Sequence, residues 1–457
     1  MEKDAEECSA SRGNASNQTM LTSALRRLAL PLLCLVLLGC PLWAQDPPRR
    51  ASIIHCTPTQ IIVDGVTMAT ANPIPDALVR AAPGCLITLS PGDYPAFRIG
   101  FNKGDNNAKN TGGLPGLPIV VRGEGLVRVR SGDGGDTLSI TQDNPNAHIT
   151  FENIEFEPSY RAAILFYRPE PGGVNEGYHF YDCNIIGGWD HRKAEGKTSK
   201  WGLNGKRLKD FEWIGRTRPS IIQDIRHEHA FYLSNMAGDT TIRNVEAKRL
   251  GRTFVQLVAR SKDGPAGVGR LLVQDCKVSD TGIAVGDNYK GGSAFTVSGN
   301  MPKAELRFEN NTYRAGFDKS LHKLTVKGQP YGSGAFVAWS EKETERLGNL
   351  ILIDNDFRFA HTCGDRAVVS ITACTSVKII GSNHFEAGTR DDGVMMRKPG
   401  FALALDHPKN PATPAPLPNL KVTFDPSTTI VGGFEIKGVP ATDAERKALG
   451  LREEVEK

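Results

Sequence analysis

The chain lacks the features that mark several common classes of protein. Its 55 Lys and Arg residues nearly balance 51 Asp and Glu residues, and a net charge of +4 argues against a nucleic-acid-binding domain. No Cys-x-x-Cys pair occurs, so a zinc site has no support. Aromatic residues make up only 7% of the chain, whereas Gly (48) and Pro (28) are plentiful. That balance favours many short strands and turns over helices.

The chain also lacks an apolar run long enough for a comfortable membrane span. Residues 28–38 are apolar and follow a basic segment that ends at Arg27, which is typical of a secretory signal peptide. Ala44 ends an expected cleavage site, and Cys40 lies in a Leu-Leu-Gly-Cys sequence that resembles a lipoprotein box. We therefore expect an exported protein, secreted or periplasmic, with lipidation at Cys40 as an alternative to cleavage. Residues 1–45 are expected to be an N-terminal extension and signal peptide.

Export would permit disulfide bonds in the rest of the chain. Two pairs of cysteines are close in sequence, Cys56 with Cys85 and Cys363 with Cys374. These two pairs are therefore the first expected to be bonded.

One short pattern recurs along the chain and predicts its fold. It reads apolar, any residue, Asn or Asp, small or polar, any residue, apolar, mostly at a spacing of about 30 residues. Its copies are 151–156, 180–185, 242–245, 273–278, 308–313, 352–357 and 380–385. A second series of apolar strands alternates with it, at 164–166, 231–233, 254–258, 295–297, 336–338, 368–371 and 403–405. Because Asn and Asp tolerate the left-handed backbone of a sharp turn, each copy predicts strand, turn and strand. Stacked copies predict a parallel β-helix.

Equivalent positions of a solenoid stack on one another. The position after the turn residue is therefore expected to form an inward ladder of Cys183, Cys276, Asn311, Asn355 and Asn383. The two Cys residues in it are expected to be buried thiols rather than disulfide partners. Residues in excess of the strands are expected to form loops on one side, where solenoids build their sites.

The start of the solenoid resembles a known family. Residues 74–94 predict a short helix, a turn, a strand and a tight turn, as in the N-terminal cap of pectin-lyase-like proteins, and the likeness continues through 116–123. The resemblance implies an all-β, right-handed parallel β-helix with an N-terminal helical cap. We expect this domain at 46–435 and a C-terminal tail at 436–457. A capping box at Thr442 and Glu445 predicts a short helix in the tail.

The segment 187–219 interrupts the repeat and is the most informative part of the chain for function. It holds Trp189, Trp201 and Trp213, three of the five Trp residues, and many basic residues, of which Arg192 is one. Aromatic faces stack on sugar rings, and Lys and Arg pair with carboxylate or sulfate. The segment therefore indicates an acidic polysaccharide as partner. The alternative is a solvated loop whose Trp side chains pack it onto the coil.

A second polar cluster leads into the strand expected at 231–233. If neighbouring coils are in register, His229 and Tyr232 lie near Arg252 and Gln256. Such a group could remove the C5 proton of a uronate, which requires a base and a positive partner for the carboxylate. The alternative is a satisfied turn network without catalytic function. A metal pair at His227 and His229 lacks a further ligand.

The following coil is similar in layout to the coil that carries the catalytic Lys of the chondroitinase-B and alginate-lyase family. In that family a Lys-Ser pair follows the strand; here Arg260-Ser261 occupies this place and Lys262 comes next. Two departures separate the chain from the family. Residues 297–300 lack its Arg, and its calcium-binding Asn-x-Glu motif is not evident.

Two functions stay open from these observations. The first is a polysaccharide lyase acting on a uronate-containing polymer by β-elimination, and the second is a non-catalytic glycan-binding or cell-envelope protein. The catalytic candidates are His229, Arg252, Arg260 and Lys262. The substrate-binding candidates are Trp189, Trp201, Trp213, Arg192, Tyr232 and Gln256. An inverting hydrolase using Asp224 and Glu228 is a weaker third idea. We expect a monomer with no metal and no cofactor, calcium being the one ion left open, with no nucleic-acid partner and no transmembrane span beyond the signal peptide.

Overall fold

The structure is a computed structural model. It describes residues 51–100, 106–109, 111–130, 136–141, 148–157, 162–167, 177–186, 210–213, 216–219, 229–234, 238–259, 269–281, 285–286, 289–290, 293–315, 334–340, 346–359, 367–387, 401–405, 421–436 and 439–451. All of them belong to one compact unit, Arg50–Lys457.

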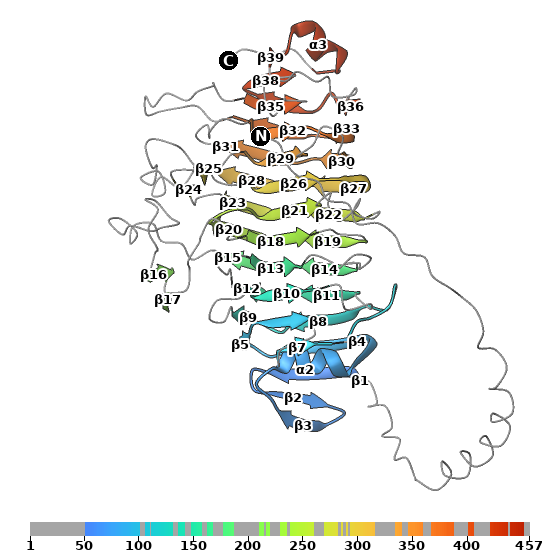
Figure 1. Ribbon diagram of the computed structural model, residues 1–457, viewed down its shortest axis with the longest axis vertical. Coiled ribbons are helices and arrows are strands. Elements are labelled where there is room, and N and C mark those ends of the chain that lie inside the picture. Colours follow the sequence, from blue (N-terminus) through green and yellow to red (C-terminus); the bar gives the residue numbers. More distant parts are fainter. Residues whose placement is uncertain are drawn as a thin grey trace, which may run out of the picture. The chain divides into compact units, whose positions relative to one another are not determined.

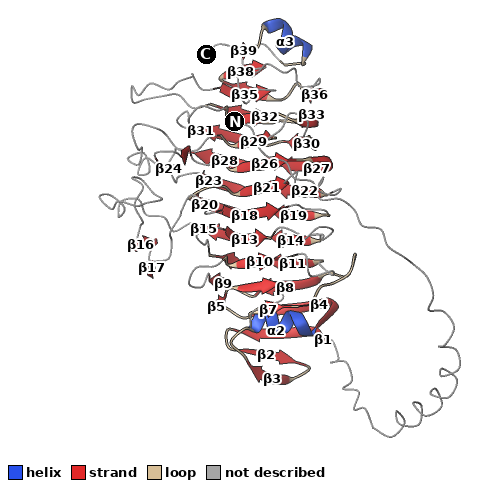
Figure 2. Cartoon of the chain, in the orientation of Figure 1, coloured by secondary structure: helices blue, strands red, loops and turns tan. Residues whose placement is uncertain are grey.

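Three long sheets dominate this unit (Figures 1 and 2). Sheet A consists, in spatial order, of β3 (Val66–Ala69), β2 (Gln60–Val63), β1 (Ala51–Thr57), β4 (Ala81–Leu89), β8 (Ile119–Gly123), β11 (Ile149–Glu152), β14 (Tyr178–Tyr181), β19 (Thr240–Arg243), β22 (Arg270–Gln274), β27 (Met301–Glu309), β30 (Leu347–Ile353), β33 (Cys374–Ile380) and β36 (Lys421–Phe424). Sheet B consists of β5 (Gly92–Pro95), β9 (Val127–Arg130), β12 (Glu155–Phe156), β15 (Asn184–Ile186), β20 (Glu246–Leu250), β23 (Lys277–Thr281), β28 (Thr312–Ala315), β31 (Asp356–Phe359), β34 (His384–Glu386) and β37 (Thr429–Val431). Sheet C consists of β7 (Asn107–Ala108), β6 (Phe97–Ile99), β10 (Leu138–Ile140), β13 (Ala162–Phe166), β18 (His229–Ser234), β21 (Val255–Ala259), β26 (Phe295–Gly299), β29 (Phe336–Trp339), β32 (Val369–Ile371), β35 (Phe401–Leu405), β38 (Gly433–Ile436) and β39 (Val439–Pro440).

The chain visits the three sheets in the order A, B, C and then returns to A one level further along. From β4 to β36, neighbouring strands of sheet A pair in parallel, as Phe151 does with Phe180 and Phe180 with Ile242. Consecutive coils therefore stack in register (Figure 1). This arrangement confirms the predicted all-β, right-handed parallel β-helix, the hand that parallel crossovers take.

The turns from sheet A to sheet B confirm the role predicted for Asn and Asp. These turn residues have positive φ angles between 51° and 56°, and they are Asn153, Asp182, Asn244, Asp275, Asn310 and Asp354. In the last copy Gly381 takes this conformation instead, with φ 73°. A left-handed residue at the same point of each coil lets the chain leave sheet A and enter sheet B within two or three residues.

The inward ladder is also confirmed. Cys183, Cys276, Asn311, Asn355 and Asn383 are all fully buried. The Asn311 side chain donates to Asn355 Oδ1 at 3.0 Å, and the Asn355 side chain donates to Asn383 Oδ1 at 3.2 Å. Asn355 Oδ1 also accepts from the backbone N–H of Asn311 at 3.1 Å, and Asn383 Oδ1 accepts from the backbone N–H of Asn355 at 3.0 Å. Buried amide groups are thereby satisfied by their neighbours in the stack.

Aromatic side chains fill the interior beside this ladder. Phe151 and Phe180 stack at a centroid distance of 5.3 Å, while Phe231, Phe254 and Phe295 form edge-to-face contacts at 5.6 and 5.7 Å. Each ring contacts the ring of a neighbouring coil, and such pairs add to the free energy gained from burying apolar surface. The hydrophobic core therefore runs along the solenoid.

A short helix lies near each end of the β-helix, as expected from the sequence. The helix α2 (Pro73–Arg80) buries Ile74, Ala77 and Leu78 at the N-terminal end. The helix α3 (Asp443–Ala448) has the predicted capping box between Thr442 and Glu445. No helix among the described residues is long and apolar enough to cross a membrane.

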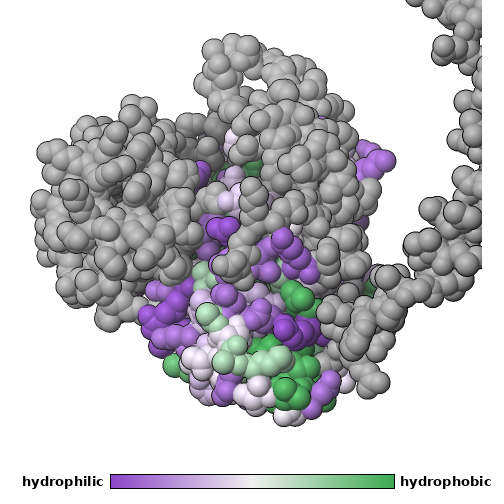
Figure 3. All heavy atoms as spheres, turned by 60° about the horizontal axis from the view of Figure 1, so that its bottom comes forward, coloured by the Kyte–Doolittle hydropathy of each residue, from purple (hydrophilic) through white to green (hydrophobic). Residues whose placement is uncertain are grey.

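The N-terminal end also contains an element that the sequence analysis missed. The strands β1, β2 and β3 form an antiparallel meander, and β2 and β3 are joined by Asp64 (φ 50°) and Gly65 (φ 80°). Two consecutive left-handed residues are typical of a tight hairpin turn. Exposed apolar side chains in this region are Ile53, Val66 and Val79, and hydrophobic residues gather on this end in Figure 3.

The predicted disulfides are wrong. Cys56, Cys85 and Cys374 are buried free thiols. Cys56 is in register with Leu89, four residues beyond Cys85 on β4, which separates the two Cα atoms by about 13 Å. That distance is too long for a disulfide. Cys363, the expected partner of Cys374, lies outside the described residues.

The two other thiols agree with the prediction. Cys183 and Cys276 are buried and free, and burial raises the pKa of each thiol to about 12. Neither thiol is a nucleophile at neutral pH.

Candidate functional site

The long connections of the solenoid all border sheet C. Only two residues separate β14 from β15, β22 from β23 and β30 from β31, on the route from sheet A to sheet B. By contrast, 187–228 lies between β15 and β18, 316–335 between β28 and β29, and 406–420 between β35 and β36. Each of these three segments enters or leaves sheet C. Since loops carried by a rigid scaffold are the usual place for a binding site, sheet C is the candidate site.

The outward-facing residues of sheet C between β10 and β35 form a surface that we call the sheet C face. Alternation along each strand identifies these residues, because their neighbours point into the core. They are Ser139, Leu165, Tyr232, Ser234, Gln256, Val258, Thr296, Ser298, Val337, Trp339, Ser370 and Ala404. None of them is acidic or basic. The charged residues facing outward on sheet C are at its ends, Arg98 on β6 and Glu435 on β38.

Tyr232, Gln256 and Thr296 stand side by side on this face and are called the central row. Tyr232 pairs with Gln256 and Gln256 with Thr296 in the parallel ladder. All three are partly exposed, whereas the next residues on either side, Leu165 and Val337, are only 4% and 2% exposed. The accessible part of this row therefore spans three strands. Register thus brings together Tyr232 and Gln256, two of the residues singled out from the sequence; their role in binding substrate stays a prediction.

Trp339 lies on the same face and was not singled out by the sequence. It ends β29, is partly exposed, and pairs with Ser298 of β26. An isolated Trp does not by itself indicate a binding site in the sequence. Its position after Phe336 and Ala338 in an alternating strand would nevertheless have predicted that it faces outward.

His229 begins β18 and is completely buried. Its Nδ1 hydrogen-bonds Thr253 Oγ1, and its ring meets the ring of outward-facing Tyr232 edge-on at a centroid distance of 5.1 Å. This contact places His229 beside the central row, and its role as the catalytic base stays a prediction.

The remaining candidates are divided between described and undescribed parts of the chain. Arg252 is partly exposed in the short connection between β20 and β21, where the chain enters sheet C. Trp213 ends β16 (Asp210–Trp213), which pairs with β17 (Arg216–Pro219) as an antiparallel hairpin. A second such hairpin joins β24 (Val285–Gly286) to β25 (Tyr289–Lys290). The candidates outside the described residues are Trp189, Arg192, Trp201, Asp224, Glu228, Arg260 and Lys262.

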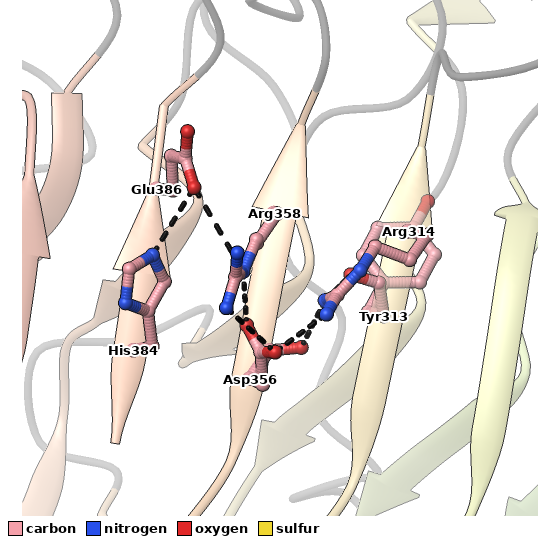
Figure 4. Close-up of polar contacts among 6 residues, drawn as sticks. All are labelled: Tyr313, Arg314, Asp356, Arg358, His384 and Glu386. Carbon is pink, nitrogen blue, oxygen red and sulfur yellow. Dashed lines mark hydrogen bonds and ion pairs between the residues drawn. The ribbon is translucent and has the colours of Figure 1, made fainter. Parts of the chain in front are cut away.

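The outer face of sheet B differs in character from the sheet C face. Figure 4 shows its C-terminal part, where Arg314 and Arg358 both bind Asp356, and Glu386 contacts Arg358 and His384. Burial raises the pKa of the Asp356 carboxyl, but hydrogen bonds and the positive charges of the two Arg residues outweigh that effect and lower it. The charges of this cluster are matched within it, so it has the character of a structural network.

In the described parts of the chain, no group of three or more His, Cys, Asp or Glu side chains could hold a metal ion. The expectation that the protein needs no metal or cofactor is not tested by this, because several long connections next to sheet C are not described. Calcium therefore stays open.

Comparisons with known proteins give one likeness in fold. No protein-family profile and no curated protein matches the chain. Among solved structures, pectin methylesterase PemA from Erwinia chrysanthemi is similar, with 11% sequence identity and a TM-score of 0.32, over 76% of this chain and 92% of that one. A likeness this low implies nothing about activity, and the assignment of the fold rests on the three parallel ladders.

Proposed function

We propose that the chain is an exported, carbohydrate-active β-helix protein that binds an acidic polysaccharide at the sheet C face and cleaves it by β-elimination. The observation that carries the proposal is the concentration of the long connections around this face. One of them, 187–228, contains three Trp residues and many Lys and Arg residues. Aromatic rings and cations are the groups that recognise sugar rings and uronate carboxylates.

β-Elimination requires a base and a stabilised carboxylate. The base takes the C5 proton of a uronate, the electron pair forms the C4–C5 double bond, and the C4–O bond breaks with protonation of the leaving oxygen. A positive side chain near the carboxylate stabilises the charge that develops when the proton leaves. His229 stays the candidate base, and the positive candidates are Arg252 at the entry to β21, and Arg260 and Lys262 directly after it.

A second function is favoured by a separate observation. The sheet C face has no Lys, Arg, Asp or Glu side chain in its described part, and its predicted base, His229, is completely buried. A face of this kind suits a non-catalytic glycan-binding protein of the cell envelope. Export, the monomeric state and lipidation of Cys40 stay predictions under both functions.

The two functions are separated by an assay for unsaturated products. Purified protein is mixed with a panel of uronate polymers, with and without calcium, and the ultraviolet absorbance of the C4–C5 double bond is followed. We expect a signal on at least one polymer, and loss of at least about 100-fold in rate in Lys262→Ala or Arg260→Ala. Lys277→Ala, on the outer face of sheet B, is the matched control and is expected to keep full activity. If at least one polymer binds but no polymer gives an unsaturated product, the lyase is contradicted and the glycan-binding protein is favoured.

A further inference from the structure

The central row contains a buried acceptor that a carboxylate cannot satisfy. Gln256 stands between Tyr232 and Thr296, and neighbouring strands are about 4.8 Å apart, so their side chains reach the same ligand. Gln256 Oε1 is buried and has no hydrogen-bond partner in the part of the chain that the structure describes. A buried acceptor without a donor costs free energy, which a ligand that supplies a donor would recover.

The orphan acceptor distinguishes between ligand groups. An ionised carboxylate has only acceptor atoms and cannot donate to Gln256 Oε1, whereas a sugar hydroxyl can donate to it and accept from the Gln256 amide group. Thr296 adds a hydroxyl that can donate or accept at the next strand. The central row therefore favours hydroxyl groups over carboxylates.

The surroundings of the row point in the same direction. No Lys, Arg, Asp or Glu side chain faces outward between β10 and β35 among the described residues, so none of these charges neutralises a uronate directly above this surface. Tyr232 at one end of the row and Trp339, two strands beyond Gln256, offer aromatic surface to the apolar face of a sugar ring. Buried Leu165 and Val337 limit the accessible row to three strands, so it accommodates a short stretch of a polymer.

We propose that the central row, with Trp339, is a subsite for an uncharged sugar unit, and that the polymer recognised by this protein contains uncharged sugars together with uronates. This proposal rests on the proposed function, which places the polymer on the sheet C face. It adds the substrate class: a mixed polymer rather than a pure polyuronate, whose uronate carboxylates lie away from the central row.

The test compares three probes by affinity electrophoresis and calorimetry: a polyuronate, a copolymer of uronate and an uncharged sugar, and an uncharged glucan. We expect the copolymer to bind most tightly. Gln256→Ala is expected to weaken that binding about tenfold, as loss of one buried hydrogen bond would. Thr296→Val is expected to weaken it by a smaller factor. Gln274→Ala is the matched control, since Gln274 is a partly exposed amide on the outer face of sheet A.

The outcomes separate this proposal from the proposed function. If a polyuronate binds or is cleaved as well as the copolymer, and Gln256→Ala changes neither, the uncharged subsite is wrong while the activity stands. If Gln256→Ala and Gln274→Ala behave alike on the copolymer with unchanged melting temperatures, the subsite is likewise wrong. If none of the three probes binds, both proposals fail.

Discussion

The outer faces of sheets B and C are built from the same repeat but carry opposite kinds of side chain. Along sheet B one row in register reads Asp93, Arg128, Glu155, Asn184, Glu246, Lys277, Thr312, Asp356 and His384. Its charges largely alternate in sign, and ion pairs such as Arg128–Glu155 at 3.1 Å connect neighbouring coils. The corresponding row on sheet C contains Tyr232, Gln256 and Thr296 and no charge between β10 and β35.

The difference shows how a solenoid can separate stability from function. On sheet B, several charges have partners on the same or a neighbouring strand, as Glu246 has with Lys248 and Arg314 with Asp356. On sheet C, Gln256 Oε1 has no hydrogen-bond partner among the described residues, and the longest connections of the chain enter and leave at this sheet. Buried polar groups are normally satisfied, so an exception on the face that all long connections border is a sign of a binding surface. Substitutions on the outer face of sheet B should therefore change stability, and substitutions on the sheet C face should change binding of the polymer.

The largest effect is expected from the turns between sheets A and B. Asn355→Ala removes a side chain that donates to Phe308 O at 2.9 Å and accepts from the backbone and side chain of Asn311. Several buried polar groups lose their partner together, and the free energy of unfolding should fall by about 3 kcal/mol or more. Chemical denaturation measures this. Asn349→Ala, at an exposed position on β30, is the control and should change it by less than about 0.5 kcal/mol. Equal losses in the two variants would contradict the structural role of the ladder.

An intermediate effect is expected on the sheet C face. Trp339→Ala removes the aromatic surface next to Ser298 and should weaken binding of the polymer about tenfold, or about 1.4 kcal/mol, with little change in melting temperature. Tyr181→Ala on the outer face of sheet A is the aromatic control; the guanidinium of Arg243 lies 4.4 Å from its ring centroid. Calorimetry with the bound polymer and a thermal melt of each variant measure the two quantities. A reversed pattern, with binding lost in Tyr181→Ala alone, would move the site away from sheet C.

The smallest effect is expected in the ion-pair cluster of sheet B. The pKa of Asp356 is lower in the folded protein than its ordinary value of 3.8. A carboxyl with a lowered folded pKa contributes stability above its unfolded pKa, and that contribution is lost as pH falls through the folded pKa. Asp356→Asn should therefore cost less than about 1 kcal/mol at neutral pH, because the pairs are partly exposed. Below about pH 3.8 the cost should shrink toward zero. Denaturation of both proteins across pH 2–7 measures this, and a cost that grows toward low pH would be incompatible with the assigned direction.

The sequence predicted the features that repeat and missed those that occur once. The turn residues Asn310 and Asp354 and the ladder from Cys183 to Asn383 were predictable, because each coil imposes the same local requirement. The Asp64-Gly65 hairpin was missed although its two residues are a turn signal, since it lies before the first repeat. Trp339 was missed because a single aromatic residue has no periodic context.

One error has a physical explanation in the pairing of strands. The Cys56–Cys85 pair was inferred from closeness in sequence, but the register of β1 against β4 places Cys56 beside Leu89. Register depends on how strands pair, and no local pattern specifies it.

The sequence by itself determined the parallel β-helix, its left-handed turns and its inward ladder, because these follow from alternation and from the conformational freedom of Asn, Asp and Gly, which act within a few residues. Only the tertiary structure decided which side chains face one another across coils, such as Tyr232 beside Gln256 and Arg314 beside Asp356. These neighbours are separated by tens of residues along the chain. Their meeting depends on the length of every connection between them, which the core does not constrain.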